Sequence, residues 1–191
     1  MAFVVVLDAC VLYSAPLRDL LLRLACAGLV QARWSDEILD ECFGHILANR
    51  PDLKPQQLRR TRDLMNPALP DAVVTGYQDL EPKLKLPDPD DRHVLAAAIR
   101  AGANAIVTFN LDDFPASALA PHRVLAIHPD AFVGDLLDLD PDRVLQVIVE
   151  QAAALKNPRK TVAELLTTLE NGELRKSVPR IRGLLERGAE A

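Results

Sequence analysis

A run of five apolar residues near the start of the sequence, residues 3–7 (FVVVL), ends directly at Asp8. A continuous β-branched run of this kind is typical of a strand buried on both faces, as in a parallel sheet. A parallel sheet needs helices to cover it, so the following segments are expected to supply them. Ligands bind at the carboxyl ends of parallel strands, which is where Asp8 would lie.

Strand and helix patterns alternate over the first 130 residues. Short apolar segments at 71–77, 104–108 and 123–127 predict three further strands. Ser35 is a suitable N-cap for one helix, and Gly102 is a suitable end for another. This alternation predicts an α/β sandwich around a mostly parallel sheet. The expected helices cover residues 17–29, 36–49, 56–65 and 89–101.

The pattern changes after about residue 130, where only helical spacing is found. Residues 1–140 carry a net charge of −7, whereas residues 141–191 carry +2. We therefore expect one α/β domain over residues 1–130 and a C-terminal helical extension over residues 131–191. The expected helices of the extension are 130–138, 142–156, 161–170 and 178–187.

Composition excludes several classes of protein. The net charge of −5 argues against a protein held to nucleic acid by bulk positive charge, and 4% aromatic residues argue against extended stacking platforms. Three cysteines without a C-x-x-C pair favour buried thiols in a reducing compartment over disulfides or zinc. No apolar run approaches the roughly 20 residues that span a bilayer, so a cytoplasmic protein without a membrane partner is expected.

Acidic residues gather at three expected strand or helix ends. Taken singly, each group has an ordinary explanation, because acids cap helices and favour turns. Three acids within four residues exceed what capping requires, however, and a parallel sheet would bring all three groups to one edge. The groups are Asp8, then Asp88, Asp90 and Asp91, and then Asn110, Asp112 and Asp113.

Such a cluster suits metal-assisted hydrolysis. Mg²⁺ and Mn²⁺ prefer oxygen ligands, and they activate bound water and offset charge on a phosphodiester. The four histidines are scattered without the spacing of a zinc site. The sequence contains no P-loop, no dinucleotide-binding glycine motif and no hydrolase nucleophile elbow.

Four segments resemble the PIN-domain ribonucleases, and in particular the VapC-type toxins of type II toxin–antitoxin systems. They are LDACVL at 7–12, ILDEC at 38–42, DPDDRHVLAAAIRAGA at 88–103 and IVTFNLDDF at 106–114. The resemblance covers about residues 1–130. It implies a three-layer α/β/α sandwich, an endoribonuclease dependent on Mg²⁺ or Mn²⁺, an RNA substrate, a cognate antitoxin and a homodimer.

The resemblance also assigns site residues. Asp8 matches the first acid of the family, Glu41 the helical glutamate, Asp91 the third acid and Thr108 the threonine that ends the fourth strand. The usual fourth acid falls on Asn110, which would be a neutral supporting group. The nearest acid that could replace it is Asp113. The implied metal ligands are Asp8, Asp91 and Asp113, with Glu41 completing the catalytic set.

Two assignments have alternatives at the level of residues. Helical periodicity places Glu41 beyond the edge of its helix's apolar face, and Glu37 is equally eligible by that criterion. Arg59, Arg60 and Arg62 are candidates for RNA contact, but a solvated helix face would look the same.

Three alternative functions remain. An aspartyl-phosphate phosphatase also places an Asp after its first strand, but it needs a second Asp where this chain has Cys10. A non-catalytic PIN-like module that binds RNA or protein is favoured by Asn110. A stand-alone RNA-processing nuclease would differ from a toxin only in having no antitoxin.

Overall fold

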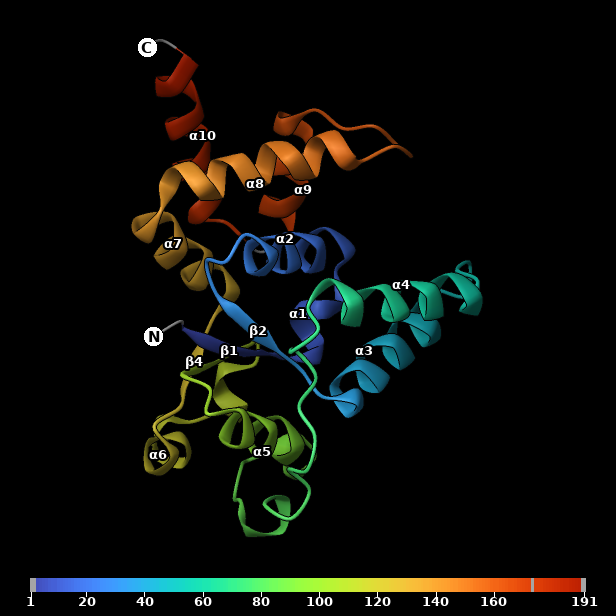
Figure 1. The fold of residues 1–191 in the computed structure, drawn as a ribbon, viewed down its shortest axis with the longest axis vertical. Coiled ribbons are helices and arrows are strands. Elements are labelled where there is room, and N and C mark those ends of the chain that lie inside the picture. The colour runs from blue at the N-terminus through green and yellow to red at the C-terminus, as the bar shows by residue number, and fades with distance from the viewer. Residues whose placement is uncertain (1–2, 173, 190–191) are drawn as a thin grey trace. The chain divides into compact units, whose positions relative to one another are not determined.

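A four-stranded parallel sheet forms the centre of one of the two compact units of the chain (Figure 1). The computed structural model describes residues 3–172 and 174–189. In the sheet β1 lies between β2 and β3, with Val5 opposite both Ala32 and Ala105, and β4 pairs with the outer side of β3. The strands are β1 (Val4–Leu7), β2 (Gln31–Arg33), β3 (Ala105–Val107) and β4 (Leu125–Ile127).

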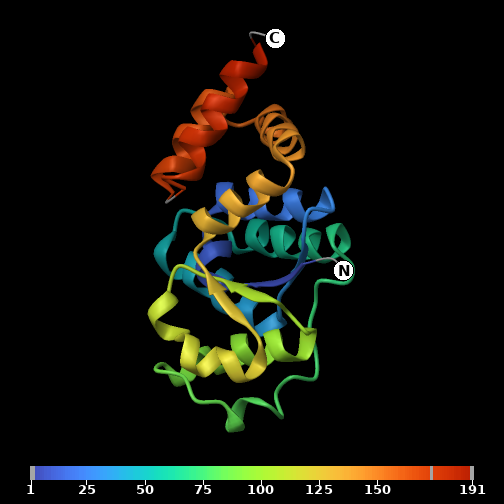
Figure 2. The same ribbon diagram turned by 90° about the vertical axis from the view of Figure 1, so that its left-hand side faces the viewer.

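Val5, Val6 and all three residues of β3 are inaccessible to solvent, as the continuous apolar runs predict. Helices lie on either side of the sheet; in Figure 2 the green-yellow α5 lies below the strands and the teal α4 above them. This is the α/β sandwich with a parallel sheet that the sequence predicts. The helices of this part are α1 (Ala9–Tyr13), α3 (Asp36–Asn49), α4 (Pro55–Ala68), α5 (Arg92–Ala101) and α6 (Ala116–Leu119).

The chain forms two compact units. The sheet unit runs up to Tyr13 and resumes over Val30–His128, and the helical unit holds Ser14–Leu29 and the chain from Pro129 onward. In the helical unit α2 packs against α8 and α9, so residues 14–29 join helices that are distant in sequence. Its helices are α2 (Ala15–Cys26), α7 (Pro129–Leu139), α8 (Pro141–Ala154), α9 (Val162–Asn171) and α10 (Ser177–Ala189).

Most expected elements are found, but the expected strand at 71–77 is wrong. That segment makes only one bridge, between Val73 and Trp34, and Gly76 turns the backbone with a φ of 68°. The edge strand is instead β2, which is too short to stand out in the sequence. The helix expected from Pro89 begins as a 3₁₀ turn (Pro89–Asp91), and the regular helix α5 starts at Arg92 and ends at Gly102, as expected, with a φ of 61°.

The expectation of buried thiols holds for only one cysteine. Cys42 is buried in α3, Cys10 is half-buried, and Cys26 is exposed at the end of α2. None of the helices in the described part of the chain has both the length and the apolar character needed to cross a bilayer.

Ser35 fixes the start of α3, the helix that carries Glu37 and Glu41. Its side chain is fully buried and its hydroxyl oxygen accepts a hydrogen bond from the Ile38 amide at 3.1 Å. This bond satisfies one of the amide groups that the first turn of a helix leaves unpaired.

Ser35→Ala should therefore lower the free energy of unfolding by about 1–2 kcal/mol, measured by denaturant titration. Ser14→Ala is the matched control, because Ser14 precedes α2 without a capping bond from its side chain. Equal losses in the two variants would show that the Ser35 hydroxyl does not stabilise α3.

Candidate active site

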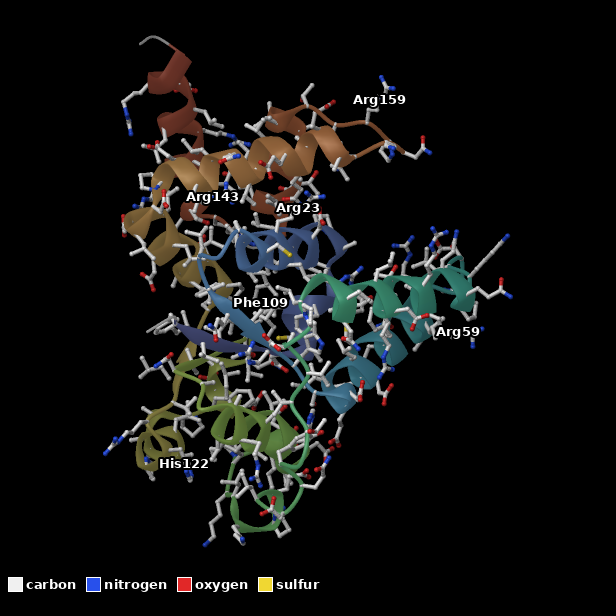
Figure 3. The ribbon with its side chains drawn as sticks, in the orientation of Figure 1. Arg23, Arg59, Phe109, His122, Arg143 and Arg159 are labelled. Atoms are coloured by element: carbon white, nitrogen blue, oxygen red, sulfur yellow. The ribbon has the colours of Figure 1, made fainter. Side chains whose placement is uncertain are left out.

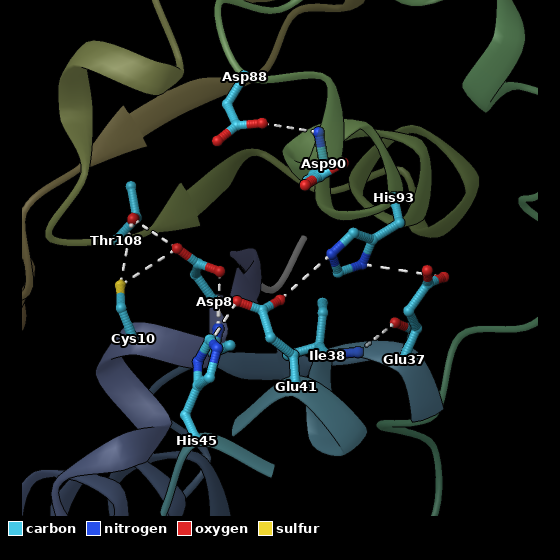
Figure 4. Close-up of polar contacts among 12 residues, drawn as sticks. Asp8, Cys10, Glu37, Ile38, Glu41, His45, Asp88, Asp90, His93 and Thr108 are labelled. Atoms are coloured by element: carbon cyan, nitrogen blue, oxygen red, sulfur yellow. Dashed lines mark hydrogen bonds and ion pairs between the residues drawn. The ribbon is translucent and has the colours of Figure 1, made fainter. Parts of the chain in front are cut away.

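The Asp8 carboxylate is buried at the carboxyl end of β1 and is held by three hydrogen bonds (Figure 4). Oδ1 accepts the Ala9 amide at 2.7 Å, and Oδ2 accepts the Thr108 hydroxyl at 2.6 Å and the Cys10 thiol at 3.2 Å. Burial raises the pKa of Asp8, while these three bonds favour the ionised form and act in the opposite direction. The bonds also fix the direction in which the carboxylate points.

Thr108 and Asn110 extend this network from the end of β3. The buried Thr108 hydroxyl donates to Asp8 and accepts the Asn110 amide hydrogen at 3.0 Å. The backbone amide of Asp8 bonds the Val107 carbonyl at 3.1 Å, so β1 and β3 are joined at the same point. The backbone of Asn110 is thus held to Thr108 at the start of the exposed turn that follows β3.

Asp91 is a carboxylate whose pKa is raised in part by the negative charges of other acids. It is half-buried at the end of the 3₁₀ turn before α5. Burial raises the pKa of Asp91 to about 7, and the negative charges of other carboxylates contribute to the same rise. In decreasing order, these are Asp8, Asp113, Asp88 and Glu41. Charges from separate segments of the chain, at residues 8, 41, 88 and 113, therefore act on Asp91.

Glu41 is positioned by histidines that sequence reasoning did not select. The His93 side chain is buried, and its Nε2 lies 3.4 Å from Oε2 of Glu41. His45 Nδ1 lies 4.0 Å from the other carboxylate oxygen of Glu41 (Figure 4). Burial opposes charge on His93, but the bond to Glu41 and the charges of Glu37 and Glu41 outweigh it and raise the pKa of His93. The only sequence signal for His93 is its place two residues after Asp91.

Glu37 and Glu41 differ in what they contact. The Tyr77 hydroxyl donates to Glu37 at 3.0 Å, and Glu37 lies 4.0 Å from Nδ1 of His93. Glu41, by contrast, is among the charges that act on both Asp8 and Asp91. Of the two glutamates that periodicity leaves open, Glu41 is therefore the one that faces the acidic cluster.

The three arginines of α4 are placed differently from one another. The Arg62 guanidinium forms ion pairs with Asp36 and Asp40 of α3, so it is already bound within the fold. Arg59 and Arg60 are exposed to solvent, and the Arg59 side chain points away from the ribbon in Figure 3.

The oxygen ligands that the site offers suit a hard divalent cation, although their side chains do not converge on one point. Within residues 3–172 and 174–189, no three His, Cys, Asp or Glu side chains converge closely enough to enclose a metal ion. The groups whose charges act on Asp91 are all carboxylates, which supply the oxygen ligands that such a cation takes. Repulsion keeps such carboxylates apart, and a cation that offsets the charge favours their approach. Burial and the Asp8 charge raise the pKa of the Cys10 thiol to about 12, so this thiol keeps its proton in the metal-free protein.

Comparisons with known proteins give two family matches and one curated relative. Residues 4–112 match the family model described as PIN domain, and residues 129–183 match the one described as VapC50 C-terminal domain. A curated protein of Mycobacterium tuberculosis (strain ATCC 25618 / H37Rv), named "Putative ribonuclease VapC50", is 43% identical over 98 residues. That match covers 51% of this chain and 57% of the relative, so the chain spans a little over half of that protein's length. No solved structure matches the chain.

The raised pKa of Asp91 predicts how stability depends on pH without metal. Between its ordinary pKa of 3.8 and about 7, folded Asp91 keeps a proton that the unfolded chain has lost. The free energy of unfolding in EDTA should therefore fall as pH rises from 5 to 8. Because Asp91 is only half-buried, we expect a fall on the order of 1 kcal/mol from this residue. Denaturant titrations of wild type and Asp91→Asn at both pH values measure it, and an equal fall in the two proteins would contradict the assignment.

Proposed function

The chain belongs to the PIN-domain family, and from this premise we propose that it is a divalent-metal-dependent endoribonuclease that hydrolyses phosphodiester bonds of RNA. The observation that carries the proposal is the set of carboxylates whose charges act on Asp91, where burial first and these charges second raise the pKa to about 7. Placing several carboxylates close together at one edge of the sheet costs free energy through like-charge repulsion, and a bound cation would offset that cost.

We assign the metal ligands to Asp8, Asp91 and Asp113, with Mg²⁺ or Mn²⁺ as the ion. When bound, such an ion lowers the pKa of a coordinated water and offsets charge on the phosphodiester. The Thr108 hydroxyl keeps Asp8 oriented through its 2.6 Å hydrogen bond. The Asn110 amide supplies a neutral oxygen in the place of a fourth acid.

Glu41 has the role of orienting the attacking water. Its carboxylate acts on Asp8 and Asp91 through its charge, and the contact with Nε2 of His93 limits how far it can rotate. A carboxylate held in this way accepts a hydrogen bond from water in a fixed direction. The other carboxylates of the acidic cluster repel Glu41, so a water molecule would be the hydrogen-bond donor to it on that side.

We further propose that the protein is the toxin of a toxin–antitoxin pair, acting in the cytoplasm, with an RNA substrate, a cognate antitoxin and a homodimeric state. The support is the 43% identical relative and the match to the VapC50 C-terminal domain. The nuclease domain would cover residues 1–130 and the extension residues 131–191, with Ser14–Leu29 packed in the helical unit rather than in the sheet unit. Arg59 and Arg60 are available on α4 to contact RNA, whereas Arg62 would first have to leave Asp36 and Asp40.

A second candidate is a non-catalytic PIN module, favoured by Asn110 where the family carries its fourth acid. The two candidates differ in a simple way. The proposed metal-dependent nuclease would cleave RNA only when a divalent cation is present, whereas a non-catalytic binding module would leave RNA intact with or without metal.

The proposed function is tested by incubating the full chain with total RNA in Mg²⁺, in Mn²⁺ and in EDTA, and mapping the new RNA ends. Asp8→Asn should lower the cleavage rate on the order of 10²-fold or more, because it removes a ligand charge. Asp112→Asn is the matched control, since Asp112 is exposed and is not among the charges that act on Asp91. RNA that stays intact in both metals would favour the non-catalytic module.

A further inference from the structure

A pocket of about 470 Å³ lies beside the acidic cluster, within the sheet unit. Cys10 and Glu41 line the pocket; the Cys10 thiol donates a hydrogen bond to the Asp8 carboxylate and the Glu41 charge acts on it, so the two sites are continuous. The side chains that line it and matter here are Cys10, Tyr13, Glu41, His45, Asn49 and Asn110. We call it the Tyr13 pocket.

Two packed helices build the Tyr13 pocket. Glu41, His45 and Asn49 are spaced four residues apart in α3, so they follow one another along a single face of that helix. Helix α1 packs against α3 and ends at Tyr13, a residue that is 37% exposed. The pocket therefore leads away from the acidic cluster, starting at Glu41 and passing His45 toward Asn49.

The lining chemistry excludes a phosphate group as the occupant. Among the described residues that line the pocket there is no lysine or arginine, and Glu41 is a carboxylate that repels anions. The other polar groups are two side-chain amides, an imidazole and a phenol. Amides present a donor and an acceptor side by side, and an aromatic ring offers a flat face. This combination suits a planar, uncharged group with donors and acceptors on its edge.

Nucleobases have this chemistry. Sequence-specific RNA recognition commonly uses unstacked bases that lie on an aromatic side chain and form hydrogen bonds through their edges. A volume of about 470 Å³ falls in the range of pockets that take small organic groups. One pocket with one aromatic ring is also compatible with an aromatic content of 4%, because it requires no extended platform.

We propose that the Tyr13 pocket binds one unstacked nucleobase of the RNA, adjacent to the phosphodiester that is cleaved. Tyr13 stacks on the base, and the Asn49 amide binds its edge. The inference rests on the proposed endoribonuclease function, and it gives that function a source of sequence preference that the acidic residues cannot supply. Phosphate is handled at the acids, and base identity is read at the pocket.

The test measures kcat and KM on a single-stranded RNA that the wild type cleaves at one mapped bond. Tyr13→Ala should lower kcat/KM on the order of 10-fold, since alanine removes the stacking surface, and Tyr13→Phe should recover most of that loss. Asn49→Ala should change which base is preferred at one position beside the cleaved bond. Asn171→Ala is the matched control, because Asn171 is also the exposed last residue of a helix, α9 of the helical unit.

A second arm removes the base instead of the side chain. RNAs with an abasic ribose at single positions near the cleaved bond are compared between wild type and Tyr13→Ala. If the base occupies the Tyr13 pocket, one abasic position should lower kcat/KM as much as Tyr13→Ala does, and combining the two should cost little more. This arm does not depend on the stability of any variant other than Tyr13→Ala, whose melting temperature is measured alongside.

The outcomes separate the two proposals. A wild type that cleaves no RNA in Mg²⁺ or Mn²⁺ would overturn the proposed function and this inference with it. A wild type that cleaves RNA, with Tyr13→Ala and Asn49→Ala matching Asn171→Ala in kcat/KM and in base preference, would overturn the pocket alone. The pocket would also be overturned if, at every abasic position, the loss in kcat/KM multiplied with the loss that Tyr13→Ala causes.

Discussion

The hydrogen bond from the Thr108 hydroxyl to the Asp8 carboxylate is the interaction on which the site depends. It joins residues 100 positions apart, at the ends of the two central strands, and it lies where solvent is excluded. A buried carboxylate without partners would be costly, so the strand pairing and the orientation of Asp8 support each other. The backbone amide of Asn110 donates a hydrogen bond to the same hydroxyl, which fixes the start of the following turn next to Thr108.

Sequence reasoning located the acids because their place at strand and helix ends is a local property. The continuous apolar run before Asp8 and the capping pattern at Ser35 are also local, and both are found in the structure. Strand β2 was missed because its three residues become a strand only by pairing with β1. The contact of His93 with Glu41 was missed because it depends on how α5 packs against α3, and the ion pairs of Arg62 depend in the same way on α4 and α3.

Like-charge repulsion links the stability of the fold to its proposed activity. Burial is the larger cause of the raised pKa of Asp91, and the negative charges of the carboxylates around it add to the rise in the metal-free protein. A cation that binds only the folded chain would recover this free energy as added stability. The neutral Asn110 lowers the repulsion relative to a site with another acid, and it leaves an uncharged amide facing the Tyr13 pocket.

The most direct test of the account is calorimetric titration of the full chain with Mn²⁺ at pH 6.5, in two buffers that differ in ionisation enthalpy. If Asp91 carries a pKa near 7 and becomes a ligand, Mn²⁺ binding should release a substantial fraction of one proton, and Asp91→Asn should abolish that release. An absence of binding, or binding with proton release that Asp91→Asn leaves unchanged, would contradict the assignment of a metal site to these carboxylates.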